Sequence, residues 1–406
     1  MTLTAEENEL LTRVGPGTPM GALLRCYWYP IAATPELTDG APTRFVRLLG
    51  EDLVLYKDRC GQVGLLADHC SHRGASLLYG RVEERGIACA YHGWLYDAAG
   101  YCLETPAEPP GSSFHLTVRH TAYPVREMCG LYWAYLGPPP APEIPRYDVW
   151  ARIDGQIQVA VYPRLDANWL QVMENTVDPS HATILHQEFM ARGRPVNTTR
   201  GLIDEELRFD FYEVPYGIIK VRTFANGFEE RHPLIFPNIL RESNVAQVRV
   251  PMDDTHTNFF FIYFIPQQSD VDGRSGINPE VHYVPPFKEP ADRIHPNTRF
   301  KWDNIMAQDF TTWETQGPIF DRTRERLATS DRIIVYFREM LRREIERVQR
   351  GEDPLAVVRD PDHSIIDTFL DQALQKRWYT PGQYSSQRAG AQRLSGDDAA
   401  ARGFFF

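Results

Sequence analysis

Cys70-Ser-His72 and Cys89-Ala-Tyr-His92, separated by sixteen residues, are the stretch of sequence that decides the fold of this chain. Each short loop carries one thiolate and one imidazole, a mixture that suits zinc or an iron–sulfur centre. Structural zinc sites are the commoner kind, but they usually pair like ligands, as in Cys-x-x-Cys and His-x-x-x-His. Because each loop offers one ligand of each type, the pattern favours two irons, with both thiolates on one and both imidazoles on the other.

Short apolar runs around these loops predict a small antiparallel β-domain. The runs 45–49, 53–56 and 63–66 are split by turn-forming glycines, and five prolines within residues 138–145 indicate a stiff linker and a domain boundary. The remaining cysteines have no matched histidine, and we predict that they are small buried hydrophobic residues. They are Cys26, Cys60, Cys102 and Cys129.

A second cluster of potential metal ligands lies between Asn168 and His186. Glu174, Asp178 and His181 follow the i, i+4, i+7 spacing of one helix face. His186 would lie about 140° away from His181 on an ideal helix, so both imidazoles can meet one metal only if the helix breaks, and the proline after Asp178 supplies a break. A plain helix with solvated acids and core histidines is the alternative. A third ligand would be a later carboxylate, and the candidates are Asp303, Asp309, Glu314 and Asp321.

The chain after the linker predicts an α+β domain around a sheet. Residues 166–177 are expected to form a helix, and residues 205–265 successive strands. Residues 330–350 have the pattern of an amphipathic helix that Ser330 caps and Gly351 ends.

Composition restricts the partners and the location. Of 406 residues, 43 are basic and 54 acidic, which gives a net charge of −11 and disfavours nucleic acid as a partner. The N-terminus lacks the basic and apolar segments of a signal peptide. The apolar run Phe259–Ile265 is far shorter than the roughly 20 residues of a membrane helix. We therefore expect no membrane contact and a cytoplasmic location, where thiols stay reduced.

Both clusters resemble motifs of the Rieske non-haem iron oxygenases, and they occur in the order of that family. Cys70–Ala75 and Cys89–Trp94 are similar to the two cluster loops, and residues 168–186 are similar to the mononuclear iron motif. Ala307–Glu325 resembles the stretch that carries the iron carboxylate in the phthalate-dioxygenase-like branch. The resemblance extends over about residues 7–350.

The resemblance implies one [2Fe–2S] Rieske cluster and one mononuclear non-haem Fe(II) per subunit. It assigns the cluster to Cys70, His72, Cys89 and His92. It assigns the mononuclear iron to His181, His186 and Asp309. Electrons from NAD(P)H would arrive through a flavin and iron–sulfur reductase. It also implies a homotrimer or trimer-based oligomer in which Asp178 bridges the cluster of one subunit to the iron of the next, with Asn175 near the iron.

The expected fold class is α+β, in four parts. Residues 1–44 form an N-terminal helical segment on the catalytic domain, and residues 45–145 form the small antiparallel β Rieske domain. Residues 146–384 form a larger, helix-grip-like α+β catalytic domain with an antiparallel sheet, and residues 385–406 form a flexible tail.

The resemblance implies the terminal oxygenase of a multicomponent aromatic-ring-hydroxylating dioxygenase, acting with O2 on a small aromatic acid such as a phthalate or a substituted benzoate. The alternative is a Rieske monooxygenase that removes O- or N-alkyl groups from an aryl ether or amine; a Rieske electron carrier or a zinc-stabilised binding protein is more distant. A carboxylate substrate favours an arginine in an otherwise apolar pocket. Candidates are Arg222, Arg231, Arg241 and Arg249. Arg241 is our preference, against the simpler interpretation of a salt-bridging arginine.

Overall fold

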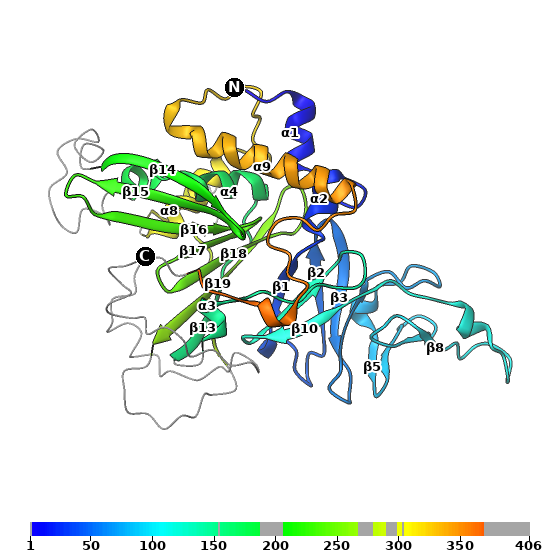
Figure 1. The fold of residues 1–406 in the computed structure, drawn as a ribbon. Coiled ribbons are helices and arrows are strands. Elements are labelled where there is room, and N and C mark those ends of the chain that lie inside the picture. Colours follow the sequence, from blue (N-terminus) through cyan, green and yellow to red (C-terminus); the bar gives the residue numbers. More distant parts are fainter. Residues whose placement is uncertain are drawn as a thin grey trace.

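The computed structural model describes residues 2–152, 155–186, 206–266, 279–289, 299–302 and 304–368. These residues form a small β-domain beside a larger part built on one broad sheet, as Figure 1 shows. The α+β fold class is confirmed. The predicted tail, residues 385–406, lies outside the described residues.

The small domain consists of short antiparallel strands. One sheet has the order β2-β3-β4-β9, formed by Thr43–Leu48, Glu51–Lys57, Val63–Ala67 and Ala122–Tyr123. A second has the order β5-β6-β7-β8, formed by Arg81–Glu83, Gly86–Ala88, Leu95–Tyr96 and Cys102–Glu104. Cys102 and Cys129 are buried and Cys26 is half-buried, but Cys60 is exposed in the turn between β3 and β4, so the prediction of burial is wrong there.

The N-terminal segment is helical only in its first half. Helix α1 spans Ala5–Thr12, opened by the predicted capping box of Thr4 and Glu7, and α2 spans Pro19–Leu24. Both helices contact α9 (Arg332–Gln349) of the larger domain. The chain then forms β1 (Trp28–Ala33), which pairs with β11 (Leu131–Tyr135) next to β10 (Val125–Met128).

The larger domain is organised around an eight-stranded sheet in the order β14-β15-β16-β17-β18-β19-β13-β20. The strands are Glu206–Val214, Gly217–Phe224, Glu229–Ile235, Ile239–Glu242, Val245–Pro251, Thr257–Pro266, Gly155–Val161 and Glu280–Tyr283. All neighbours are antiparallel except β13 and β20, which run parallel at the edge. The sheet is therefore mixed, whereas the sequence led us to expect an antiparallel one.

The helices of the larger domain pack against this sheet or at its edges (Figure 1). They are α3 (Asp148–Ala151), α4 (Trp169–Val177), α5 (Ser180–Leu185), α8 (Ile305–Thr315) and α9 (Arg332–Gln349). Helix α9 begins one residue later than predicted, because Asp331 and not Ser330 is its N-cap. Gly351 follows its last turn with a φ of +76°, as a helix-ending glycine should.

Short elements complete the described chain. The 3₁₀ turns are Thr34–Glu36, Leu77–Tyr79, Phe114–Thr117, Thr329–Asp331 and Pro361–His363. The two-stranded pairs are β12 (Arg146–Tyr147) with β23 (Ile365–Ile366), and β21 (Lys288–Glu289) with β22 (Arg299–Phe300). Among the described helices, none combines the length and the apolar character needed to cross a membrane.

Backbone hydrogen bonds join the two domains. The N–H of Leu49 donates to the carbonyl of Pro251 at 3.0 Å, and the N–H of Gly50 donates to that of Met252 at 2.8 Å. The β2–β3 turn is thereby attached to the end of β18, so the small domain is fixed to the sheet against which the second cluster of ligands lies.

Candidate metal centres

The two Cys-and-His loops of the small domain share one backbone design. In each loop the cysteine N–H donates to the carbonyl five residues later, and the glycine four residues after the cysteine donates back to the cysteine carbonyl at 2.9 Å. Gly74 has a φ of +71° and Gly93 a φ of +74°, a region that favours glycine. Two glycines therefore close two equivalent loops around Cys70 and Cys89.

The predicted cluster ligands lie together on these loops. Cys70 and Cys89 are buried, whereas His72 is exposed. Burial raises the pKa of the Cys89 thiol, the N–H groups of Tyr91 and His92 oppose this shift, and the neighbouring Cys70 adds to it. The rings of His72 and His92 lie 4.5 Å apart between centroids. Paired inner thiols and paired outer imidazoles fit the donor set of a Rieske cluster.

Hydrogen bonds from polar groups fix the position of the loop that contains Cys70. The hydroxyl of Tyr96 lies 3.2 Å from Sγ of Cys70. Nε2 of the buried His120 lies 2.8 Å from the carbonyl of Ala67 and must donate to it, so Nδ1 accepts from the hydroxyl of Ser71 at 2.7 Å. The loop is thus tied to β4 beneath it.

Three potential metal ligands meet in the larger domain. Nε2 of His186 lies 3.3 Å and Nε2 of His181 4.0 Å from Oδ1 of Asp309, and the three ligand atoms lie within 4.8 Å of one another. Burial alone would lower the pKa of His186, but Asp309 and Gln308 raise it overall. Oδ1 of Asp309 is buried and accepts no well-formed hydrogen bond from the described residues. A buried carboxylate oxygen between two imidazoles fits a non-haem iron site.

A break between α4 and α5 brings the two histidines together. Helix α4 ends at Val177, and Asp178 is extended with φ −69° and ψ 118°, so the break expected at Pro179 is confirmed. The Asp178 carboxylate accepts the N–H groups of Ser180 at 2.8 Å and His181 at 3.1 Å and thereby caps α5. Its carbonyl accepts the Nδ1–H of His181 at 2.7 Å, which leaves Nε2 free to bind a metal.

The other acidic candidates lie elsewhere. Glu314 forms an ion pair with a lysine of β21, Asp321 is exposed, and Asp303 lies outside the described residues. Asn175 is half-buried in the last turn of α4, where its carbonyl accepts the N–H of Asp178 at 3.1 Å.

Glu174 anchors α4. Its carboxylate accepts a forked pair of bonds from Arg322, at 2.8 and 2.6 Å, and a third bond from Arg338 at 2.6 Å. Burial would raise the pKa of Glu174, but the two guanidinium groups lower it overall. The network ties α4 to α9 and to the segment between α8 and α9. The sequence alone pointed to neither arginine.

The sheet face beneath α4 and α5 is polar. Directly opposed residues of antiparallel strands share a face, and the registers place one set of polar side chains together: Gln158, Lys220, Arg222, Glu242, Gln247 and Arg249. Lys220 donates to the carbonyl of Thr176 at 2.7 Å, and Arg222 donates to the hydroxyl of Thr183 at 2.7 Å. These bonds hold α4 and α5 over the polar face.

This face carries buried positive charge close to the iron ligands. Burial lowers the pKa of Lys220 to about 8 and that of Arg249 to about 9, and the carboxylates of Asp309 and Glu242 oppose the shift at Arg249. Arg249 donates to Gln247 at 2.9 and 2.8 Å, while its Nε finds no acceptor within the described chain. Polar and apolar residues alternate along β15 and β18. The sequence does not show which face of these strands lies toward the iron ligands, so the alternation alone could not identify these residues.

Arg241 is not on this face, which corrects our preference for it. It pairs with Ala246, whose side chain points to the opposite side from Gln247, and its guanidinium is buried 2.8 Å from the carboxylate of Asp148 on α3. Arg241 is therefore an internal ion-pair residue. Of the other candidates, Arg231 lies beside Glu229 at 2.7 Å, and Arg222 and Arg249 are on the iron side.

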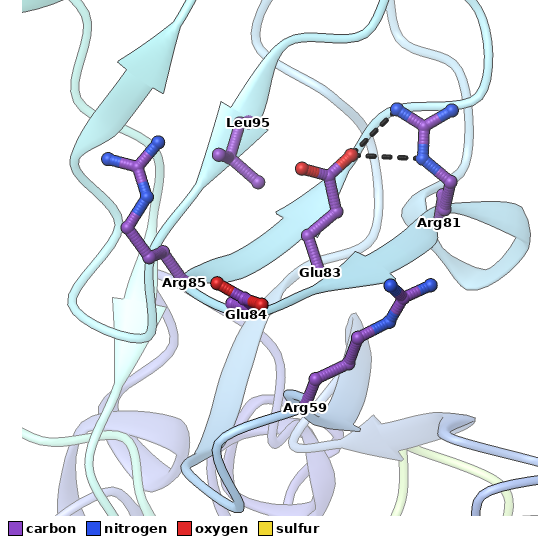
Figure 2. Close-up of a pocket in the computed structure, with 6 residues that line it drawn as sticks. All are labelled: Arg59, Arg81, Glu83, Glu84, Arg85 and Leu95. Atoms are coloured by element: carbon purple, nitrogen blue, oxygen red, sulfur yellow. Dashed lines mark hydrogen bonds and ion pairs between the residues drawn. The ribbon is translucent and has the colours of Figure 1, made fainter.

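A hollow of about 420 Å³ lies on the small domain, and none of its lining residues is a predicted metal ligand. It is lined by Arg59, Arg81, Glu83, Glu84, Arg85 and Leu95. Figure 2 shows Glu83 turned toward Arg81, with hydrogen bonds of 2.9 and 2.6 Å. Arg85 also forms an ion pair, with Glu104. Most of the positive charge that lines the hollow is therefore neutralised by neighbouring carboxylates.

Taken together, the fold and the two ligand sets define a protein that joins an iron–sulfur domain to a catalytic domain with a His₂-carboxylate metal site. Comparison with known families agrees. The model of the Rieske [2Fe-2S] domain matches residues 27–124, which include both loops, and that of a LigXa C-terminal domain matches residues 301–372.

Similar proteins support the same class. The chain is 41% identical over 376 residues to the 5,5'-dehydrodivanillate O-demethylase oxygenase subunit of Sphingobium sp. strain SYK-6, covering 88% of this chain and 84% of that one. It is 34% identical over 410 residues to the phthalate 4,5-dioxygenase oxygenase subunit of Pseudomonas putida, covering 90% and 92%. The solved structure of Pseudomonas putida CBB5 NdmA shares the fold, with a TM-score of 0.57, 22% identity and coverage of 82% and 94%.

The chain therefore belongs to the Rieske non-haem iron oxygenases, as a terminal oxygenase subunit of the phthalate-dioxygenase-like branch. It is an oxidoreductase that carries one Rieske [2Fe–2S] cluster and one mononuclear non-haem iron.

Proposed function

We propose that this chain is the terminal oxygenase of a multicomponent system that inserts oxygen from O2 into an aromatic acid, with electrons from NAD(P)H. The observation that carries the proposal is the meeting of His181, His186 and Asp309 within 4.8 Å in a chain that also contains the cluster domain. In this proposal those three residues hold the iron, and Cys70 and Cys89, with the two loop histidines, hold the cluster.

The ligand sets suit different chemistry. When bound, the cluster supplies single electrons and the iron supplies open coordination positions for dioxygen. The chain's own residues orient these groups. The Asp178 carbonyl holds the ring of His181 by its Nδ1–H at 2.7 Å, and burial of His186 and Asp309 keeps solvent from the metal side of the site.

An anionic substrate is supported by the charge on the sheet face. Arg249 is buried near Asp309 and has an Nε–H without an acceptor in the described chain. Lys220 adds a second buried cation on the same face. A guanidinium in such surroundings binds a carboxylate more strongly than one in water does. The two named relatives include one that acts on phthalate, an aromatic dicarboxylate.

O-demethylation is the second candidate, because the relative at 41% identity is an O-demethylase oxygenase subunit. The same two ligand sets serve either reaction, because ring hydroxylation and attack on a methoxy group differ in which substrate carbon faces the iron.

One experiment separates these reactions. The holoenzyme is supplied with a reductase, NADH and ¹⁸O₂, and with a panel of phthalates, benzoates and methoxybenzoates. Two labelled atoms in a cis-diol indicate dioxygenation, whereas formaldehyde release with a free phenol indicates demethylation. Absence of O₂ uptake on the whole panel, with a reductase shown to reduce the cluster, would contradict the proposal for aromatic acids.

We further propose a cytoplasmic, head-to-tail homotrimer or multiple of it, in which Asp178 carries electrons from one chain's cluster to the next chain's iron. The exposed His72 supports this arrangement. Mixing Cys89→Ser chains, which lack the cluster, with His186→Ala chains, which lack the iron, should restore activity in mixed oligomers. A monomer in native mass spectrometry, or inactive mixed oligomers, would contradict it.

A further inference from the structure

Gln308 joins α8 to the end of α5 at the iron site. Its side chain is only 1% exposed, and its amide oxygen lies 2.8 Å from Nδ1 of His186. It is the residue before Asp309 on α8, so one turn of helix supplies both a potential iron ligand and a partner for another. Neither the sequence motif nor any comparison draws attention to it.

The two orientations of the Gln308 amide differ in how they satisfy its neighbours. In one, its oxygen can accept the Nδ1–H of His186 but also faces the carbonyl of Leu185, while its nitrogen faces the Nε1–H of Trp302. Turned over by 180°, its nitrogen donates to Nδ1 at 2.8 Å and to the carbonyl of Leu185 at 3.0 Å, while its oxygen accepts from Nε1 of Trp302 at 3.3 Å.

The orientation is linked to the tautomer of His186. A neutral imidazole has one N–H, so a metal on Nε2 requires the proton on Nδ1 and an acceptor facing it. In the other tautomer Nε2–H faces Oδ1 of Asp309 at 3.3 Å, and Nδ1 needs a donor. A primary amide provides both an acceptor and a donor at this one position, which neither a carboxylate nor an apolar side chain does.

We propose that Gln308 is the positioning residue of His186: its amide oxygen accepts the Nδ1–H, which leaves Nε2 for the metal ion. This inference rests on the iron site proposed above. It predicts that metal affinity, and not only turnover, depends on the chemistry of residue 308.

The test measures metal binding directly. Protein that retains its oxidised cluster is depleted of mononuclear iron and titrated with Co²⁺ against a competing chelator, and the EPR spectrum of bound high-spin Co²⁺ is recorded. The variants are Gln308→Leu, Gln308→Asn and Gln308→Glu. Gln171→Leu is the matched control, because Gln171 is an equally buried amide that donates to the carbonyls of Trp313 and Gly317 at 2.7 and 2.9 Å, without touching His186.

Loss of the acceptor should weaken Co²⁺ binding by about 10- to 100-fold in Gln308→Leu, with a changed EPR spectrum. Gln308→Asn, one methylene shorter, should lie between Leu and the wild type. Gln308→Glu should bind at least as tightly as the wild type, because a carboxylate always accepts from Nδ1–H. Equal affinities for Gln308→Leu and the wild type, or equal losses in Gln308→Leu and Gln171→Leu, would overturn the inference. Failure of the wild type to bind one Co²⁺ per chain would instead contradict the iron site.

Discussion

Replacing Glu174 by glutamine should destabilise the larger domain, because it removes the only carboxylate that both Arg322 and Arg338 share within the described chain. The two guanidinium groups are 0% and 3% exposed. Breaking a buried ion pair on one side costs about 3–5 kcal/mol. Arg338 keeps Glu325, and Arg322 keeps neutral oxygens of Asn8 and Phe320, so the low end, about 3 kcal/mol, is the expected loss. At about 2–4 °C per kcal/mol, Tm falls by about 6–12 °C.

Urea unfolding followed by far-UV circular dichroism measures this loss, with the visible spectrum of the cluster as a record of the small domain. The matched control is Glu213→Gln, which breaks a pair with Arg343 whose side chains are 32% and 45% exposed. That surface pair should contribute at most about 1 kcal/mol. If Glu174→Gln loses no more than Glu213→Gln, the assignment of Glu174 as the anchor of α4 is refuted.

The pH dependence of folding stability tests whether the charge of Glu174 is responsible for this stabilisation. Because the pKa of Glu174 is lowered in the folded state, its stabilising contribution is complete above the usual glutamate pKa of about 4.3 and is lost as pH falls through the lower folded pKa. The difference between wild type and Glu174→Gln should therefore shrink as pH falls below about 4.3. A difference that stays constant with pH would show that shape, and not charge, is responsible.

Four further predictions test other parts of the structure. Asp178→Asn should keep both metals, since asparagine also caps α5, yet nearly abolish turnover; metal analysis beside product formation checks this, and normal turnover would contradict the electron bridge. Arg249→Met should raise KM for an aromatic acid at least about tenfold, whereas Arg241→Met should leave KM unchanged but lower the urea midpoint, because it leaves the buried Asp148 carboxylate without its guanidinium partner. Since the pKa of Lys220 is lowered to about 8, the wild type should gain stability between about pH 8 and 10.4 relative to Lys220→Met, and a flat difference would disprove the buried charge. A ferrous chelator should remove activity and not the visible spectrum of the cluster, and Fe²⁺ should restore it.

Local chemistry made several features predictable from the sequence. The capping box of Thr4 and Glu7 and the break at Pro179 depend on bonds between residues at most four positions apart. The two Cys-and-His loops are likewise short, and each glycine after them closes its own loop. In these places all of the interacting groups lie within a few residues of one another in the sequence.

Burial on both faces of a strand explains what the sequence could not settle. Strand β18 is buried along its whole length, so alternation cannot tell which side holds the metal ligands. Arg241 and Arg249 each follow a buried aliphatic residue, and the register places them on opposite faces. Gln308 and Arg322 contact residues more than 100 positions away in the sequence, so no local sequence pattern predicts these contacts.

The exposure of the ligands indicates where the two centres can communicate. At the cluster the thiols are buried and His72 is exposed. At the iron site His186 and Asp309 are the more buried side chains, whereas His181 and Asp178 are 18% and 19% exposed. Each centre therefore has one histidine, His72 or His181, that is more exposed than its other ligands. Asp178 holds the more exposed iron histidine through its backbone carbonyl, so its carboxylate can face an imidazole from a second copy of the chain without releasing the first. The break that assembles the iron site thus also places the carboxylate that would bridge the two centres in the proposed oligomer.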